Sequence, residues 1–333
     1  MGYGMQAAMR ERYGSPDVVA MREIERPTPA EGEVVVRVVV ASVNRADLDG
    51  IEPRPQFTRL FLGLRAPRNQ RVGLDVAGVV DAVGDGVTRL RPGDAVFADL
   101  YPFSQGSFAE FVSAPERAFQ PIPTGMSFET ASTMPHSATL AIQGLRRRKG
   151  RTVGPGDSVL IDGASGNVGP FAVQIAKALG AVVTGTCSPA KVDFVRSLGA
   201  DHVLDYTTVD YTKTAERYDW ILDTDSHHSL FRCRRSLKPG GTYVTLGGTA
   251  WQILASLTAG PLVSLFSDRK SGLMLWWKPF RKEDVAAVAA MIAAGKVAPA
   301  IDRRFPLSEV VEALRYVDDG HARGKVLLEV SAP

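Results

Sequence analysis

Cysteine is the scarcest informative residue in this sequence: Cys187 and Cys233 are the only two among 333 residues. Two thiols can build neither a disulfide framework nor a four-thiolate zinc cage, because both need more sulfur atoms than the chain supplies. A disulfide-rich secreted protein is therefore excluded. The compartment that we expect is a reducing cytoplasm.

The chain also lacks a strong charge imbalance and a long apolar run. Its formal net charge of +3 is too small to indicate nucleic acid or an anionic membrane as the main partner. The most apolar stretch, Trp251 to Phe266, contains Gly260 and Pro261 and is shorter than the ~20 residues of a membrane span. We interpret it as a buried or subunit-facing segment. The N-terminal residues have no apolar core either, so we expect no leader and no membrane partner. The partner that we expect is a small-molecule ligand.

Three sections of the chain differ in pattern. β-branched runs separated by turn residues follow one another up to residue 128 and predict a β-rich domain. From 129 to 296 strands and helices alternate, which predicts a doubly wound parallel sheet of the Rossmann type. The last strand, Lys325 to Val330, cannot be stable alone, so we expect it to return to the first section. The predicted fold is α/β, with 1–128 and 297–333 as a discontinuous domain and 129–296 as a nucleotide-binding domain.

The alternating section has six expected strands. They are Ser158 to Asp162, Ala181 to Thr186, His202 to Tyr206, Trp220 to Thr224, Thr242 to Gly248 and Lys270 to Leu275. A helix is expected at Ser229 to Leu237, and we place His227 and His228 in it.

A glycine-rich turn, Asp162 to Gly169 (DGASGNVG), joins the first of these strands to a helix. Ala164 and Ser165 permit a tight turn, Gly166 lets the backbone approach a diphosphate, and Gly169 lets helix and strand pack closely. The amides of Asn167, Val168 and Gly169 then face the phosphates at the positive end of the helix. Because the strand–turn–helix context is complete, the pattern predicts a dinucleotide site rather than a turn without a ligand.

The end of the second strand reads GTCSPAK, Gly185 to Lys191. An NAD site has a carboxylate here, which binds the ribose 2′-hydroxyl and repels a 2′-phosphate. This segment has none. Ser188 can donate a hydrogen bond and Lys191 can pair with a 2′-phosphate, although a lysine on an exposed helix is also common. The pattern favours NADPH over NADH.

Several blocks of the sequence together resemble the medium-chain dehydrogenase/reductase superfamily, and within it the zinc-independent quinone oxidoreductase branch. They are ASVNRAD (Ala41 to Asp47), GLDVAGVV (Gly73 to Val80), GDAVFA (Gly93 to Ala98), GASGNVGPFAVQIAK (Gly163 to Lys177), LGAD (Leu198 to Asp201) and RGKV (Arg323 to Val326). The resemblance implies a GroES-like catalytic domain built from both chain ends, a Rossmann domain, and an active site in the cleft between them. It also implies a homodimer, with the sheets paired through the strand Thr242 to Leu246.

Zinc-dependent members of this superfamily hold their catalytic metal with a Cys, a His and a second Cys. Asn44, Leu74 and Pro135 occupy the matching positions here, and the four-cysteine structural zinc loop is missing. His136 stands alone beside a proline, and a lone histidine is more often structural than a ligand. We therefore predict a protein without a metal site.

The resemblance also assigns roles to individual residues. Asn44 and Asp47 would be catalytic, Asn44 as a neutral donor to substrate or ribose, although Asp47 could instead brace a loop. Further cofactor contacts would come from Thr139 beside the nicotinamide, Tyr206 near the adenosine phosphate, Gly247 and Gly248 along the ribose, and Lys325, which could also be a surface cation.

Without a Lewis acid a plain alcohol is a poor substrate, whereas a conjugated acceptor spreads the charge of an added hydride onto oxygen. We expect an NADPH-dependent reductase of quinones or α,β-unsaturated carbonyls, with a proton donor that the sequence does not identify. Two segments, Arg54 to Arg65 and Trp251 to Trp277 with Met274 and Trp276, would shape the pocket or form core and dimer contacts. Two other functions stay open: an NADPH-binding sensor or interaction protein without turnover, and a zinc alcohol dehydrogenase.

Overall fold

The computed structural model describes residues 4–103, 106–146, 151–225, 227–275 and 277–332. The chain divides into two compact units. The first contains Met1–His136, Pro279–Val285 and Ile301–Pro333, and the second contains Ser137–Lys278 and Ala286–Ala300. The first boundary falls after His136 and not after residue 128, because helix α3 (Phe128–Thr133) packs against strands of the first unit. Pro279–Val285, expected in the nucleotide-binding domain, also belongs to the first unit.

A sheet of seven strands forms the core of the first unit, in the order β14-β15-β3-β4-β5-β7, with β6 also paired to β3. The long apolar strand β3 is buried along most of its length, since strands flank it and the helices α3 and α10 pack on it. The strands are β3 (Glu33–Val43), β4 (Asp75–Val83), β5 (Ala95–Asp99), β6 (Phe111–Pro115), β7 (Gln120–Pro121), β14 (Ile301–Pro306) and β15 (Lys325–Glu329).

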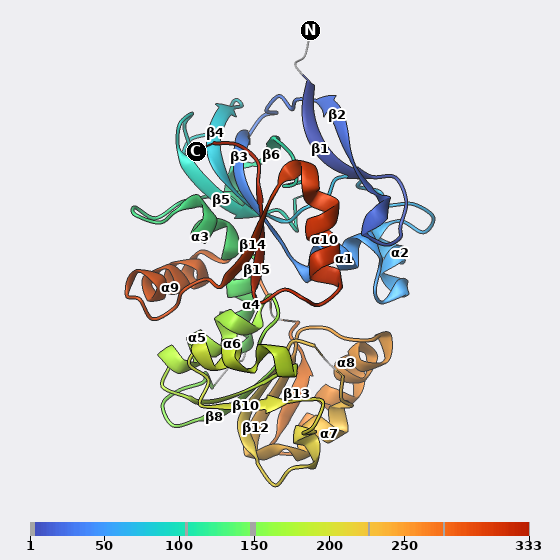
Figure 1. Ribbon diagram of the computed structural model, residues 1–333, viewed down its shortest axis with the longest axis vertical. Helices are drawn as coiled ribbons and strands as arrows, with labels where there is room; N and C mark the ends of the chain where they lie inside the picture. The colour runs from blue at the N-terminus through green and yellow to red at the C-terminus, as the bar shows by residue number, and fades with distance from the viewer. Residues whose placement is uncertain (1–3, 104–105, 147–150, 226, 276, 333) are drawn as a thin grey trace. The chain divides into compact units, whose positions relative to one another are not determined.

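The C-terminal strand β15 pairs antiparallel with β3, with Leu328 opposite Ala41. Figure 1 shows this red strand within the first unit, next to segments from the blue end of the chain. The return of the last strand to the first section is confirmed. The remaining elements here are β1 (Gly4–Arg10), β2 (Val19–Glu25), α1 (Arg45–Ile51), α2 (Arg59–Leu62), α3 and α10 (Val310–Asp318).

The second unit has a sheet of six strands in the order β10-β9-β8-β11-β12-β13, and every pair is parallel. This confirms the doubly wound Rossmann-type fold. The strands are β8 (Ser158–Asp162), β9 (Val182–Cys187), β10 (His202–Asp205), β11 (Tyr218–Asp223), β12 (Leu237–Thr245) and β13 (Lys270–Leu273). The helices are α4 (Ser137–Gly144), α5 (Gly169–Ala178), α6 (Val192–Ser197), α7 (Leu230–Arg235) and α8 (Ala250–Leu265); α9 (Lys282–Ala293) follows along the chain.

Three expectations for this section are wrong. His227 and His228 precede α7, and Leu237 already belongs to β12. β12 cannot pair with a second copy, because β11 and β13 occupy both of its edges. The segment Trp251 to Phe266, expected to be buried or subunit-facing, forms helix α8 up to Leu265. Its side chains Trp251, Leu265 and Phe266 are exposed, which excludes burial, and a subunit-facing position stays a prediction.

Within the part of the chain that the structure describes, none of the helices has the length and apolar character needed to cross a membrane.

Candidate active site

The glycine-rich turn follows β8 and is folded tightly against it. Gly163 has φ +80°, a left-handed conformation that glycine adopts without strain. The amide of Ala164 donates to the carbonyl of Thr186 at 3.0 Å, which joins the turn to the end of β9. A Cβ on Gly169 would lie 2.3 Å from the Gly163 carbonyl oxygen, so only glycine lets α5 begin here.

Gly166, in contrast to Gly169, lies in open surroundings. It is exposed, and a Cβ there would meet only the Gly163 carbonyl oxygen, at 3.6 Å. The backbone of Gly166 is thus accessible just before the N-terminus of the ten-residue helix α5, whose first turn contains Pro170. Accessible backbone at a helix N-terminus attracts phosphate, so these residues fit a dinucleotide.

Asp162, Thr186 and Thr224 hold the turn in place. Thr186 donates its hydroxyl to Asp162 Oδ1 and accepts from the Gly163 amide at 3.1 Å. Thr224 donates to the Asp162 carbonyl at 2.8 Å. The two threonines were not recognised in the sequence, although both follow from the parallel sheet, which places the carboxyl ends of β8, β9 and β11 side by side.

The Asp162 carboxyl group is buried, and within the described part of the chain its Oδ2 has no hydrogen-bond partner. Burial, reinforced by the nearby charge of Asp223, raises the pKa of Asp162 to about 7.

The end of β9 leads into a short 3-10 helix, Pro189–Lys191, with Ser188 in extended conformation before it. Ser188 and Lys191 are both half-buried. The next strand does supply a carboxylate: Asp205 is paired in register with Cys187. Its Oδ1 accepts from both the amide and the hydroxyl of Thr207, at 2.8 and 2.7 Å.

The other predicted cofactor residues of the second unit are dispersed along the chain. Tyr206 donates its amide to the Cys187 carbonyl at 3.2 Å, and its side chain is 57% exposed. Gly247 accepts from the Thr245 hydroxyl at 2.8 Å, and Gly248 has φ +129°. Thr139 is buried in α4.

The expected pocket-wall residues have mixed surroundings. Met274 is buried and Trp277 is half-buried, whereas Trp276 lies outside the described residues.

A second group of polar residues is buried in the first unit. We call Asn44, Asp47, Asp75, Asp99, His136 and Lys325 the buried cluster; each is 7% exposed or less. Lys325 donates its ammonium to Asn44 Oδ1 at 2.5 Å and lies 3.5 Å from Asp75 Oδ2. Its burial shows that Lys325 is not a surface cation.

Asn44 uses its amide group within the cluster. Its Nδ2 donates to Asp75 Oδ2 at 3.0 Å and to the Ser42 carbonyl at 3.3 Å. These two bonds engage both amide hydrogens. The geometry therefore favours a positioning role for Asn44 over the direct donation to substrate that the resemblance implies.

Asp47 lies in the first turn of α1. Its Oδ2 accepts from the Asn44 amide at 2.7 Å, which fixes the start of the helix. Its Oδ1 is buried and has no hydrogen-bond partner among the residues that the structure describes. Burial raises the pKa of Asp47 to about 7, so this carboxyl group exchanges a proton near neutral pH.

His136 was expected to stand alone, but in the structure it has two carboxylate partners. Its Nδ1 lies 3.0 Å from Asp99 Oδ2, and its backbone amide donates to Asp75 Oδ1 at 3.0 Å. Although burial alone would lower the pKa of His136, the carboxylates of Asp99 and Asp75 raise it overall. Burial raises the pKa of Asp75, against the opposing charge of Lys325.

The buried cluster does not fit a zinc ion. The three positions that match zinc ligands are an amide, Asn44, and two residues without a ligand atom in their side chains, Leu74 and Pro135. The amide oxygen of Asn44 already faces the ammonium of Lys325, which would repel a metal cation. Among the described residues, no group of three or more His, Cys, Asp or Glu side chains is arranged to hold a metal.

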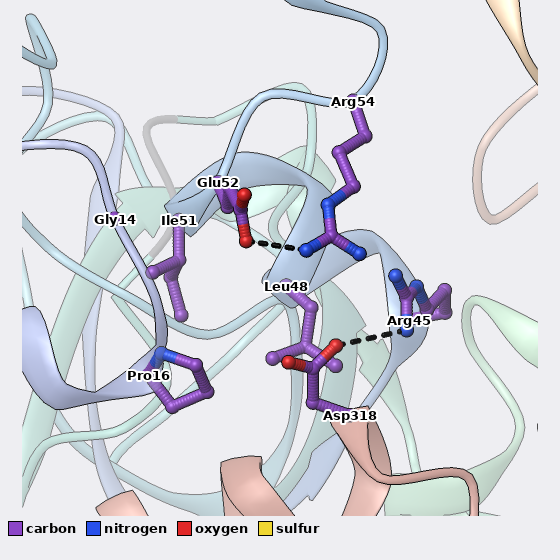
Figure 2. A pocket seen from close by; sticks show the side chains of 8 residues that line it. All are labelled: Gly14, Pro16, Arg45, Leu48, Ile51, Glu52, Arg54 and Asp318. Carbon is purple, nitrogen blue, oxygen red and sulfur yellow. Dashed lines mark hydrogen bonds and ion pairs between the residues drawn. The ribbon is translucent and has the colours of Figure 1, made fainter.

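A shallow depression that encloses no cavity volume lies on the surface of the first unit, beside α1 (Figure 2). Leu48 and Ile51 line it together with two arginines. Arg45 pairs with Asp318 at 3.1 Å and Arg54 pairs with Glu52 at 2.6 Å, as the dashed lines in Figure 2 show. Both guanidinium groups thus have carboxylate partners.

Two protein families match separate parts of the chain. Residues 30–124 match the alcohol dehydrogenase GroES-like domain, and residues 198–328 match the zinc-binding dehydrogenase family.

The curated relatives match almost the whole chain. The mitochondrial NAD(P)H oxidoreductase RTN4IP1 of Mus musculus is 32% identical and covers 98% of this chain and 89% of its own length. The chloroplastic quinone-oxidoreductase QR1 of Triphysaria versicolor is 30% identical, with 98% of both chains covered. The chloroplastic NADPH-dependent alkenal/one oxidoreductase of Arabidopsis thaliana is 29% identical and covers 97% of this chain and 79% of its own.

Among solved structures, the quinone oxidoreductase from Coxiella burnetii aligns with a TM-score of 0.84 at 26% identity, over 99% of this chain and 100% of that one. The resemblance drawn from the sequence motifs is confirmed. The chain is an oxidoreductase and belongs to the quinone oxidoreductase branch of the medium-chain dehydrogenase/reductase superfamily.

Proposed function

We propose that this protein reduces quinones or α,β-unsaturated carbonyls with a hydride from NADPH and needs no metal ion. The observation that carries the proposal is the tight turn at Gly163 and Gly169 with the accessible backbone of Gly166 before α5. The acceptor class is supported by the relatives, which are named as quinone and alkenal/one oxidoreductases.

The chain's own residues would hold the cofactor at several points. The turn from Ala164 to Gly169 would receive the diphosphate, and Tyr206 offers an exposed ring just after β10, the strand on the far side of β9. Thr139, Gly247, Gly248 and Lys325 are proposed at the nicotinamide end. When bound, NADPH supplies a hydride to an electron-poor carbon of the acceptor and leaves negative charge on the acceptor's oxygen.

We assign the preference for NADPH to Ser188 and Lys191. The segment after β9 offers a hydroxyl and an ammonium and contains no carboxylate. Asp205, in the adjacent strand, lies in register with Cys187, and Thr207 donates two hydrogen bonds to it. A 2′-phosphate would gain from the cation, whereas a 2′-hydroxyl would not.

We assign proton donation to Asp47. Its pKa near 7 keeps a large share of the carboxyl group protonated at neutral pH, and its Oδ1 has no partner inside the protein. The proton would pass to the enolate or hydroquinone oxygen, and water would return a proton to the carboxylate afterwards. Asn44 and Lys325 would be positioning residues, because they fix the start of α1 and the charge balance around Asp47.

We propose that the protein works without zinc, because the residues at the positions of the zinc ligands do not suit the metal. The Asn44–Lys325 contact places an ammonium where a metal-binding relative would need a ligand, and a Lewis acid is not required for a conjugated acceptor.

We also propose a homodimer in the cytoplasm. β13 ends the sheet of the second unit, so its outer edge can pair with a second copy, in place of β12. The two cysteines are buried thiols without a disulfide, as a reducing compartment favours.

The test is consumption of NADPH by the purified protein with a panel of quinones, enals and enones, with NADH in parallel. We expect turnover with NADPH and a lower kcat/KM with NADH. Tight NADPH binding without turnover of any acceptor would instead favour the sensor or interaction protein.

A further inference from the structure

The segment from Pro53 to Gln70 follows α1 and combines exposed apolar side chains with arginines. Four of its apolar residues are exposed to solvent: Phe57 by 45%, Leu60 by 60%, Phe61 by 74% and Leu64 by 67%. Figure 1 shows α2, which carries two of them, at the margin of the first unit in this view. We call these four residues the apolar patch.

The apolar patch follows a helical spacing of i, i+3, i+4 and i+7. Its residues lie on a 3-10 turn, Gln56–Thr58, then on α2, and then just after Gly63. An amphipathic helix of a globular protein normally turns such a stripe toward the core. Here all four side chains are exposed, so the first unit does not bury them.

The inward side of the segment is anchored by polar contacts. The Tyr13 hydroxyl donates to the Gly63 carbonyl at 2.8 Å, and the guanidinium of Arg59 lies 4.9 Å from the centre of the Tyr13 ring. The Arg68 amide donates to the Leu62 carbonyl at 2.8 Å. These contacts hold the segment with its apolar patch outward.

The charge of the segment is of one sign. It contains Arg54, Arg59, Arg65 and Arg68 and no Asp or Glu. Arg54 pairs with Glu52, but Arg65 and Arg68 are exposed on either side of Ala66 and Pro67. The whole-chain charge of +3 conceals this local concentration of positive charge, so the net charge alone gives no indication of a membrane partner.

We propose that the apolar patch and its arginines dock this protein on an anionic lipid surface. The four apolar side chains would enter the boundary between headgroups and acyl chains, while Arg65 and Arg68 contact lipid phosphates. An acidic protein surface would satisfy the arginines but would also have to supply an apolar cavity for four protruding side chains. A bilayer offers both without a shaped pocket, and the charge and the exposure together favour it.

The experiment is co-sedimentation of the full chain with vesicles, without nucleotide. Vesicles of phosphatidylcholine are compared with vesicles in which about a third of the lipid is phosphatidylglycerol. We expect binding to the anionic vesicles only, weakened by added salt. Phe61→Ser/Leu64→Ser should reduce the affinity roughly tenfold or more, and Arg65→Glu/Arg68→Glu should reduce it in low salt. The matched control Leu262→Ser/Leu265→Ser removes exposed apolar side chains from α8 and should bind like the wild type.

A labelled variant tests whether the patch itself enters the bilayer. Cys187 and Cys233 are buried, so a thiol introduced by Leu64→Cys can carry an environment-sensitive dye selectively. Its fluorescence should rise on anionic vesicles, while that of the same dye on Leu265→Cys should not. Absence of wild-type binding, undiminished binding of Phe61→Ser/Leu64→Ser, or an equal loss in the α8 control would overturn the proposal. Because no cofactor is present, none of these results bears on the proposed reduction.

Discussion

The ammonium of Lys325 lies 2.5 Å from the amide oxygen of Asn44, although 281 residues separate them in the chain. The pairing of β15 with β3 brings them together in the interior of the first unit. In this buried setting Lys325 offsets the charge of Asp75, and burial lowers the pKa of Lys325 itself. The contact links the two ends of the chain to the acid chemistry proposed for Asp47.

Removal of this ammonium should destabilise the protein strongly. Lys325→Met leaves the buried carboxylate of Asp75 without its cation, and breaking a buried ion pair in this way costs about 3–5 kcal/mol. Urea unfolding at neutral pH measures the loss. The control Lys213→Met, at a lysine whose side chain is 72% exposed, should change the free energy of unfolding by less than about 0.5 kcal/mol. Similar losses in both variants would refute the role of Lys325.

Asp47 should make the stability depend on pH in a defined window. Its pKa is about 7 in the folded protein and 3.8 as the reference value, so the folded state binds more protons between these pH values. Stability contributed by the protonated group therefore falls as the pH rises from about 4 to about 7 and is level above that. Asp162 acts in the same window, so the contribution of Asp47 is the difference between wild type and Asp47→Asn. Parallel stability curves for the two proteins would contradict the assignment.

The same variant separates proton donation from binding. Asp47→Asn should lower kcat by roughly a hundredfold, the usual minimum for a general acid, and leave the KM for NADPH nearly unchanged. In the wild type kcat should fall as the pH rises past about 7, since the carboxyl group then loses its proton. A wild-type pH profile retained by Asp47→Asn would show that another group donates the proton.

Two glycines of the nucleotide turn should respond differently to the same substitution. Gly169→Ala places a Cβ 2.3 Å from the Gly163 carbonyl oxygen and should disrupt the turn, with a loss of thermal stability. Gly166→Ala has its nearest neighbour at 3.6 Å, so it should fold normally. Its Cβ would instead obstruct the diphosphate and weaken NADPH binding. Calorimetric titration and thermal unfolding separate the two effects, and unchanged affinity in folded Gly166→Ala would place the diphosphate elsewhere.

Lys191 should decide between the two nicotinamide cofactors. Lys191→Ala is expected to weaken NADPH binding about tenfold, which corresponds to about 1.4 kcal/mol, and to leave NADH nearly unaffected. Lys213→Ala is the control, because Lys213 lies in the same unit and its side chain is 72% exposed. Equal losses for both cofactors would show that Lys191 does not recognise the 2′-phosphate.

Local patterns in the sequence were sufficient to predict the Rossmann sheet and the glycine-rich turn. Strands β8, β9 and β11 each contain a short apolar run, and the turn lies within eight consecutive residues, Asp162 to Gly169. The paired threonines Thr186 and Thr224 were missed, because their role depends on the order of the strands in the sheet and not on their neighbours in the chain.

The buried cluster could not be predicted in full for the same reason. Asp75, Asp99 and His136 come from segments far apart in the chain, and β3, β4 and β5 bring them together. Taken alone beside Pro135, His136 gave no sign of its contact with Asp99. For α8 the sequence left burial and a subunit-facing position open, because an apolar run indicates that a surface is covered and does not reveal by what.

We propose above that the protein transfers a hydride from NADPH to a conjugated acceptor without a metal ion. The most direct measurement uses NADPH deuterated at C4 and an α,β-unsaturated aldehyde, with protein that has been treated with a chelator and assayed for zinc. We predict deuterium on the β-carbon of the product at an undiminished rate, with no stoichiometric zinc. If chelation abolished turnover and zinc restored it, or if deuterium appeared on the carbonyl carbon, metal-free reduction of the conjugated double bond would be refuted.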